Sequence, residues 1–413
     1  MTRRTLLSIV ALALMLLLAG WLLQPLLDDS SIWPPDDYVE YWAAGRLNLQ
    51  GQNPYSPELL LPLERGAGRD TDEAVMMWNP PWTLSAAMLL GALPARVGQF
   101  AWLALQAGCL VASALMLGRQ CGATSGEPTR VSGRVNSILV SHPDARSHPP
   151  AHAGRLAVLL TFTFVPTLFL LQSGQIAGLL VLGAALFAVL AQRGSPMIAG
   201  VAAVLLAIKP HLAYLIWFAV ALDAVQHRRY RIVLGGILGG ALFTLIPMAF
   251  NPDVWTHYVA AYRDHPPTQW VSLTLGSILR FAFGERHFWL NFAPMLLGLA
   301  WFVRHWRSHG RTWNWTEQMP AILLVSFATA PYGAWHFDLP LLLIPIWHLA
   351  STLTGTRRRV ALALFASANI LMLALNAGGV TSFYYAWVAP LVLVAYFGLR
   401  LPARSPSPAL VPA

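Results

Sequence analysis

The stretch VAAVLLAIKPHLAYLIWF, residues 201–218, places a charged side chain in the middle of an apolar run. Lys209 is the only lysine in the chain of 413 residues, in which every other basic residue apart from histidine is arginine. The proline that follows it removes a backbone donor and interrupts an α-helix. We therefore expect two short helical arms that meet at Lys209-Pro210.

The composition decides what surrounds this lysine. Hydrophobic residues make up 56% of the chain and charged residues only 11%, with a mean hydropathy of +0.54, whereas soluble proteins carry roughly 25% charged residues. Apolar runs recur from Leu6–Leu27 to Tyr385–Leu399. Since a spanning helix needs about 20 mostly apolar residues, the sequence predicts an all-α polytopic membrane protein, a single integral membrane domain over residues 1–413 with about twelve transmembrane helices.

The arginines predict the orientation of these helices. They cluster in loops around residues 193, 228–231, 304–311 and 357–359, which the positive-inside rule places in the cytoplasm. The loops between them face outward, including residues 28–77, which hold ten of the 18 acidic residues and three arginines. Arg3 and Arg4 precede Leu6–Leu27, which we interpret as an uncleaved first span. Residues 119–153 are rich in proline, serine and arginine and are expected to form a flexible connector, on a side that the charges leave open.

Other classes of site receive little support from the composition. The net charge of +9 comes from arginines in short loops and does not indicate nucleic-acid binding. The two cysteines, Cys109 and Cys121, imply neither a disulfide framework nor a metal cluster. We expect no cofactor and assign no metal ligand, and the sequence leaves open whether a divalent metal assists.

Lys209 has two interpretations at this depth. The lysine could extend from a helix end to the membrane interface. Alternatively it faces an outward-opening cavity and pairs with an anion, because charges within a membrane usually do so. A phosphate is the natural anion, since a lysine ammonium binds phosphate as a point charge.

The outward loop offers a second candidate group. Asp36 and Asp37 follow the first apolar run by a few residues, and Tyr41, Trp42 and Leu47 recur after them at near-helical spacing. This spacing predicts a helix that lies on the membrane interface. The turn residues of GQNPY, residues 51–55, end it. An acidic pair in such a loop is most often solvated surface charge, and its tryptophans can belong to an interfacial belt.

The order of several motifs resembles the polyprenol-phosphate-sugar-dependent glycosyltransferases of family 87, which have the GT-C membrane fold. The resemblance covers residues 36 to 350 and rests on five motifs in sequence order: DYVEYWAAGRLNLQGQNPY (37–55), WNPPW (78–82), Gly174-Gln175, AGVAAVLLAIKP (199–210) and APYGAWHFD (330–338). The last motif has Phe337 where the family usually has tyrosine.

The resemblance implies a mannosyltransferase-like enzyme of the cell envelope in the bacterial inner (plasma) membrane, with its active site facing outward. Such an enzyme moves a sugar, with inversion, from a polyprenyl-phosphate donor to a lipid or glycan acceptor, and membrane lipids surround it. Asp37 is then the expected general base, because a positioned carboxylate can take the proton of the acceptor hydroxyl. The expected donor-phosphate ligands are Lys209, His211 and His336. The expected substrate-binding residues are Asp36, Tyr41, Tyr55, Gln175 and Asp338.

Two alternatives stay open from the sequence. A chain with many spans and outward ionisable residues could be a lipid or solute transporter or a flippase. Transporters tend to show inverted repeats and broken helices near the midplane, and we find one broken run and no repeat. An inactive scaffold with the same GT-C-like fold is the other alternative, which only an assay separates from an enzyme.

Overall fold

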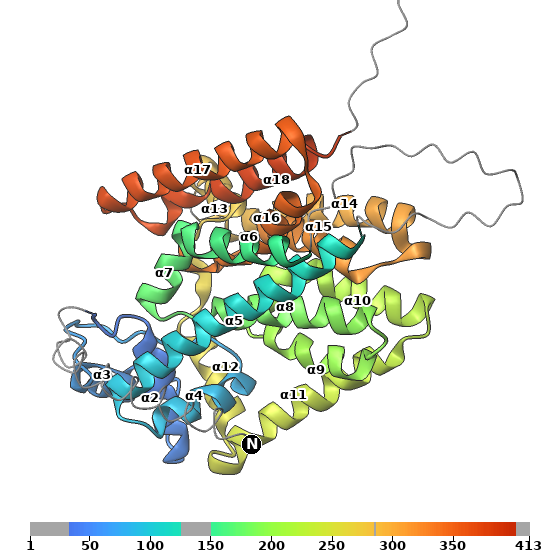
Figure 1. Cartoon of the computed structure of the whole chain (residues 1–413). Coiled ribbons are helices and arrows are strands. Elements are labelled where there is room, and N and C mark those ends of the chain that lie inside the picture. The colour runs from blue at the N-terminus through green and yellow to red at the C-terminus, as the bar shows by residue number, and fades with distance from the viewer. Residues whose placement is uncertain (1–32, 125–149, 285, 402–413) are drawn as a thin grey trace, which may run out of the picture. The chain divides into compact units, whose positions relative to one another are not determined.

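The computed structural model describes residues 33–124, 150–284 and 286–401, and all regular secondary structure in these ranges is helical. The all-α prediction is thereby confirmed (Figure 1). The expected first span and most of the connector 119–153 lie outside the described residues.

The α-helices are α2 (Tyr38–Leu49), α3 (Pro57–Gly66), α4 (Leu84–Gly91), α5 (Ala95–Thr124), α6 (Pro150–Thr163), α7 (Val165–Ser173), α8 (Ala177–Gln192), α9 (Pro196–Leu206), α10 (Tyr214–Gln226), α11 (Tyr230–Phe250), α12 (Val254–Asp264), α13 (Leu275–Phe283), α14 (Ala293–His309), α15 (Trp315–Ala328), α16 (Leu343–Thr352), α17 (Gly355–Ala377) and α18 (Val388–Gly398).

Short 3₁₀-helices connect several of these elements. They are η1 (Pro81–Thr83), η2 (Pro210–Ala213), η3 (Pro267–Gln269), η4 (Phe288–Phe292), η5 (Gly310–Thr312), η6 (His336–Leu342) and η7 (Ser382–Tyr385). Three of the seven begin at a proline, which cannot donate a backbone hydrogen bond: η1, η2 and η3 begin at Pro81, Pro210 and Pro267, and η6 contains Pro340 in its interior.

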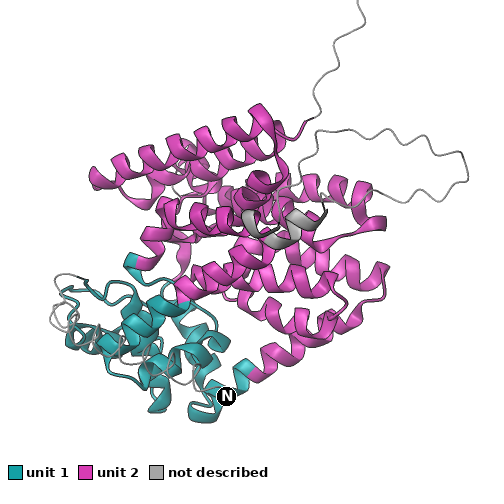
Figure 2. Cartoon of the chain, viewed as in Figure 1, with its two compact units in different colours: residues 1–105, 172–175, 243–265 teal, residues 106–171, 176–242, 266–413 magenta. Residues whose placement is uncertain are grey.

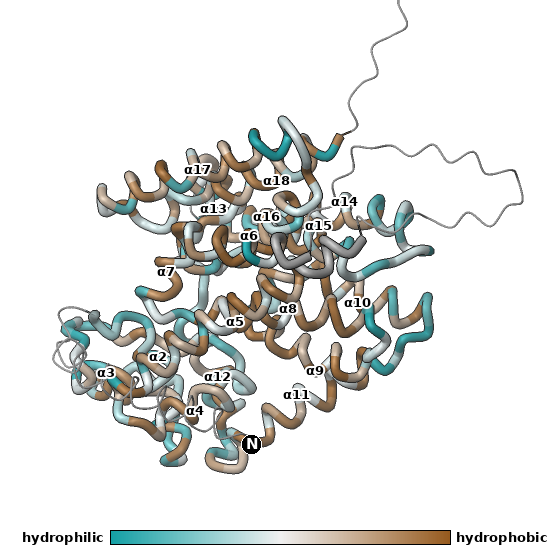
Figure 3. Tube along the Cα trace, in the orientation of Figure 1, coloured by the Kyte–Doolittle hydropathy of each residue, from teal (hydrophilic) through white to brown (hydrophobic). Residues whose placement is uncertain are grey.

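Several helices suit a membrane. Three of those described are long and apolar enough to cross one, at Ala95–Gly118, Tyr230–Phe250 and Gly355–Ala377. A fourth candidate is the pair Ala153–Thr163 and Val165–Ser173, bent by 63°. Apolar residues follow these helices along their length (Figure 3). Helices such as Ala177–Gln192 and Pro196–Leu206 are apolar but shorter. Some of the transmembrane helices expected from the sequence are thus present, and the total of about twelve stays a prediction.

The helices gather into two compact units (Figure 2). Among the described residues, unit 1 contains 33–105, 172–175 and 243–265, and unit 2 contains the others. In unit 1, helices α2 and α4 lie in close contact at Gly45 and Gly91. A Cβ atom at Gly45 would overlap the backbone of Ala87, and one at Gly91 would overlap the backbone of Arg46. The two glycines therefore permit a backbone-to-backbone approach that holds α2 in place.

Helix α2 confirms one expectation and corrects another. It begins directly after Asp37 and ends at the turn of Gln50 and Gly51, as the sequence predicted. However, ten of its 12 residues are buried. A helix lying on a membrane interface would expose one polar face, so the expectation of an interfacial helix is wrong for α2. The run Ala43-Ala44-Gly45, whose small side chains allow close packing, explains the burial.

The break at the lysine is confirmed in unit 2. Helix α9 ends at Leu206, η2 begins at Pro210 and α10 begins at Tyr214. Lys209 itself has φ −128° and ψ 72°, outside the helical region. A second interruption lies between α15 and α16, where the chain leaves the helix after Ala328 and passes through η6. Within a membrane, non-helical backbone is tolerated only where it is buried in protein or lines a cavity.

Candidate active site

A chain of hydrogen bonds joins three predicted site residues in unit 1. The hydroxyl of Tyr41 donates to Oε1 of Gln175 at 2.8 Å, and Nε2 of Gln175 donates to Oδ2 of Asp37 at 3.0 Å. Asp37 precedes α2, and Tyr41 lies on its first turn, so that spacing of four residues places both on one face of the helix. The structure thus brings together three residues that are separated by up to 138 positions in the sequence.

Local backbone geometry explains how Gln175 reaches Asp37. Gly174 has φ +69°, and a Cβ atom there would lie 2.6 Å from Cβ of Tyr38. Its carbonyl oxygen accepts a hydrogen bond of 2.7 Å from Nε1 of Trp102, whose ring also contacts Tyr41 with centroids 5.4 Å apart. The turn is therefore fixed from two sides, and a larger residue at position 174 would displace it from α2.

This arrangement suits a carboxylate that accepts a proton. Asp37 is half-buried, so a substrate group can still reach it. The amide of Gln175 is a neutral donor. Such a donor orients a carboxylate. Tyr41 holds the amide oxygen, which leaves the amide nitrogen of Gln175 facing Asp37.

Two further acidic residues surround this group. Asp36 has φ +28°, an unusual value for a residue other than glycine. Its side chain reaches the surface. Partial burial of the carboxyl, followed by repulsion from the negative charge of Asp37, raises the pKa of Asp36 to about 6. Glu64 is fully buried, and its Oε2 accepts hydrogen bonds from the amide of Val75 at 3.0 Å and from Arg69 at 3.4 Å. Burial raises the pKa of Glu64, and the charge of Asp37 contributes to the increase.

Tyr55 is part of the packing of unit 1. Only 2% of this residue is exposed, and its hydroxyl donates to the carbonyl oxygen of Asn79 at 3.2 Å. Its ring contacts Tyr258 with centroids 5.4 Å apart. These contacts connect the GQNPY turn to the WNPPW segment, so Tyr55 supports the packing of unit 1, and its contact with substrate stays a prediction.

Lys209 and Asp338 form an ion pair in unit 2. The Nζ atom of Lys209 donates to both carboxylate oxygens, at 2.7 and 2.9 Å. Lys209 is 9% exposed and Asp338 is fully buried. The interpretation of a lysine that extends to the interface is therefore wrong. Asp338 also accepts a hydrogen bond from the amide of Trp335, and the ring of Phe337 lies 5.1 Å from the ammonium.

The pair connects the two interrupted helices. Lys209 stands before η2, and Asp338 lies within η6. An ammonium has three N–H donors, and the bidentate contact with Asp338 uses two of them. Direct binding of a donor phosphate through Lys209 would have to share the ammonium with this carboxylate.

The two predicted histidines lie near the same interruptions. The ring of His336 contacts Phe169 and Tyr385, and its Nδ1 lies 2.6 Å from Oγ of Ser382. His211 stacks on Tyr332 with ring centroids 5.3 Å apart, and its Nε2 lies 3.4 Å from the carbonyl oxygen of Gly333. Ser382 was not predicted, because an isolated serine near the end of an apolar chain carries no pattern.

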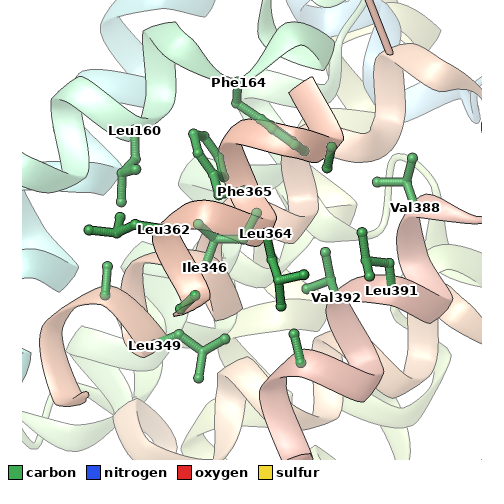
Figure 4. Close-up of a pocket in the computed structure, with 14 residues that line it drawn as sticks. Leu160, Phe164, Ile346, Leu349, Leu362, Leu364, Phe365, Val388, Leu391 and Val392 are labelled. Carbon is green, nitrogen blue, oxygen red and sulfur yellow. The ribbon is translucent and has the colours of Figure 1, made fainter. Parts of the chain in front are cut away.

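Two other features contribute no acid–base chemistry. Among the described residues, no three His, Cys, Asp or Glu side chains are close enough together to hold a metal ion. An apolar pocket of about 60 Å³ lies between α6, α16, α17 and α18, lined by aliphatic side chains and by Phe164 and Phe365 (Figure 4). Such a lining offers contact to hydrocarbon only.

Comparison with known families shows to which one the chain belongs. The model of glycosyltransferase family 87 matches residues 78–331, which is more than half of the chain. No curated protein and no solved structure matches the chain. The matched range contains Gln175, Lys209 and His211, while Asp37, His336 and Asp338 lie beyond its ends.

Proposed function

Because the chain belongs to glycosyltransferase family 87, we propose that this membrane glycosyltransferase takes a mannose-like sugar from a polyprenyl-phosphate donor. The acceptor in this proposal is the hydroxyl group of a lipid or glycan. The apolar helices support a lipid-linked donor, since they place the enzyme in the same phase as its hydrocarbon chain.

Asp37 is the general base in this proposal, and its contact with Gln175 is the observation that carries it. The acceptor hydroxyl gives its proton to Asp37 as its oxygen attacks the anomeric carbon of the sugar. The bond from that carbon to the phosphate oxygen breaks, and the electron pair leaves with the lipid phosphate. A single displacement of this kind inverts the anomeric configuration, and a positioned base typically contributes about 10²–10⁴-fold in rate.

The leaving phosphate needs a cation or a hydrogen-bond donor. His336 is the best candidate in unit 2, because Nδ1 is next to Ser382 and Nε2 is then the ring nitrogen that can donate to a ligand. His211 is a second candidate. We propose that Lys209 acts mainly through Asp338, by holding η2 and η6 and with them the two histidines in position.

We further propose that the chain resides in a bacterial inner membrane with Asp37 on the outer side. The distribution of arginine supports this orientation, since arginine-rich loops alternate with loops that contain Asp37, Gln175, Lys209 and Asp338.

The test is transfer of a labelled sugar. Purified full-length protein in nanodiscs is incubated with polyprenyl-phosphate mannose, glucose or arabinose and with a lipid extract as acceptor. We expect label to move from one donor into a product whose anomeric configuration is the opposite of that of the donor. Transport of an intact labelled donor across vesicles, with no new product, would instead support the flippase alternative.

A further inference from the structure

Helix α17 carries a polar side chain that is directed into unit 2. Among the 23 residues of this helix, all of which the structure describes, only Asn369 and Met372 are buried, and Asn369 is 8% exposed. Most of its apolar stretch is exposed or half-buried, in a helix long enough to cross a membrane. A polar residue within such a helix is costly unless its hydrogen bonds are made. The partners of Asn369 therefore indicate what it does.

The side-chain amide of Asn369 is hydrogen-bonded at both ends. Its Oδ1 accepts a hydrogen bond of 2.7 Å from the backbone amide of Val165. Its Nδ2 donates at 2.8 Å to the carbonyl oxygen of Phe365, one turn earlier in α17. The second bond fixes the orientation of the amide group, because its nitrogen can only donate. The oxygen is therefore directed at Val165.

Val165 is the first residue of helix α7. The first amides of an α-helix have no acceptor within the helix, and a side chain just before it often supplies one. The residue at this place is Phe164, whose side chain has no acceptor atom. Asn369 supplies the acceptor from another helix, and the rings of Phe164 and Phe365 stack with centroids 5.8 Å apart (Figure 4). Helix α17 thus holds the start of α7, where the chain bends by 63° after α6.

The start of α7 determines where Phe169 lies. This residue is one turn further along the helix, on the same side as Val165. Its ring packs edge-on against His336 with centroids 5.0 Å apart and against Tyr385 with centroids 5.4 Å apart. The rings of His336 and Tyr385 also stack, with centroids 5.8 Å apart. The three rings form one cluster, so the position of the imidazole depends on α7.

Helix α17 is also connected to the other part of this cluster. The chain passes from α17 through a short turn into η7, which contains Ser382 and Tyr385. Oγ of Ser382 accepts a hydrogen bond of 3.0 Å from the backbone amide of His336 and lies 2.6 Å from its Nδ1. The bond between Asn369 and Val165 therefore joins α7 to α17, and the segments next to this junction contact His336.

We propose that Asn369 is a positioning residue for His336. It holds α7 against α17, and Phe169 and η7 then fix the direction of the imidazole ring. Both polar atoms of its side chain are bonded to backbone, so Asn369 acts through these contacts and not by touching substrate. This role rests on the proposed function, in which Nε2 of His336 donates to the leaving phosphate.

The position of His336 can be measured without sugar transfer. Full-length protein with isotope-labelled histidine is studied by NMR in nanodiscs, and the ring signals of His336 are identified by their loss in His336→Gln. We expect Asn369→Leu to shift these signals and to leave those of His309, an exposed residue of α14, unchanged. Asn376→Leu is the matched control, because it removes an exposed amide of the same helix, and it should shift neither. Unchanged His336 signals in Asn369→Leu would overturn the proposal.

Two substitutions of Asn369 separate hydrogen bonding from packing. Asn369→Asp keeps an acceptor for the amide of Val165, at a helix N-terminus where negative charge is favoured. Asn369→Leu keeps a similar volume but has no acceptor. We expect Asn369→Leu to lower kcat about tenfold and Asn369→Asp to retain most of the turnover. A role in packing alone gives the reverse order, because a carboxylate among apolar helices is more costly than leucine.

The variant His336→Gln shows through which residue Asn369 acts. In this background Asn369→Leu should lower kcat no further, because the effects of two changes on one group do not add. An additive loss would overturn the proposal. Wild-type turnover in His336→Gln, together with shifted His336 signals in Asn369→Leu, would instead refute the proposed role of His336 in transfer while supporting the positioning of its ring.

Phe169→Leu provides a second test if Asn369→Leu does not fold. It leaves the bond between Asn369 and Val165 intact and removes the aromatic contact with His336. We expect the His336 signals to shift in this variant as well. If they match those of wild type, α7 does not position the imidazole and the proposal is wrong.

Discussion

Lys209 and Asp338 lie 129 residues apart in the chain and meet in a bidentate ion pair, with Nζ 2.7 and 2.9 Å from the two carboxylate oxygens. Each charge lies in an interruption between apolar helices, one before η2 and one within η6. The only lysine of the chain is therefore the partner of a buried carboxylate. A charge this deeply buried requires such a partner, since desolvation of an unpaired ion costs several kcal/mol.

Breaking this pair should destabilise the protein more than removing it. We expect Lys209→Met to cost about 3–5 kcal/mol because it leaves Asp338 buried without its cation, and Lys209→Met with Asp338→Leu to recover most of the loss. Thermal unfolding in detergent measures both. Arg263→Gln is the control, since it breaks an exposed ion pair that water and salt screen. Equal unfolding midpoints for Lys209→Met and the control would refute this account of the pair.

Gln175 should affect turnover through the orientation of Asp37. We expect Gln175→Leu to lower kcat about 10- to 100-fold with little change in KM for the donor, because a hydrogen bond to a charged carboxylate contributes about 1.5–3 kcal/mol. Tyr41→Phe should have a smaller effect, since it removes only the hydroxyl group that holds the amide oxygen. Gln106→Leu is a matched control, because the amide of Gln106 is buried and has no hydrogen-bond partner among the residues that the structure describes. A larger loss in Tyr41→Phe than in Gln175→Leu would contradict this order of contacts.

Glu64 should make stability depend on pH. Burial raises its pKa above the ordinary value of 4.5, so the folded state holds the proton more tightly than the unfolded state does. Stability is then highest below pH 4.5 and falls as the pH rises through the elevated pKa of the folded state. Unfolding midpoints recorded from acid to neutral pH should show this decline in wild type and in the exposed variant Glu73→Gln. Glu64→Gln should reduce this decline. If the unfolding midpoint of Glu64→Gln depended on pH as strongly as that of wild type, the role of the buried carboxyl would be refuted.

The sequence was sufficient for features that depend on local patterns. The proline after Lys209 predicted the break between α9 and α10, and the residues from Asp37 to Gly51 predicted α2 and its end. The burial of α2 was missed, because it depends on the contact between Gly45 and Ala87, which no spacing within one helix specifies.

Contacts between distant residues were also beyond local patterns. Gln175 and Asp37 were both chosen as site residues, but their hydrogen bond depends on the turn at Gly174 and its contact with Tyr38. Ser382 and Glu64 were missed for a related reason. Each is a single polar residue whose significance comes from burial and from partners elsewhere in the fold.

The most direct test of the account is turnover of Asp37→Asn with a labelled polyprenyl-phosphate sugar. Asparagine keeps the size of the side chain but cannot take up the proton, so we expect kcat to fall at least about 10²-fold. Donor binding should be unchanged, because the proton is transferred only in the transition state. Asp70→Asn, which alters an exposed carboxylate of the same segment, should behave as wild type. Wild-type turnover in Asp37→Asn would contradict the assignment of Asp37 as general base.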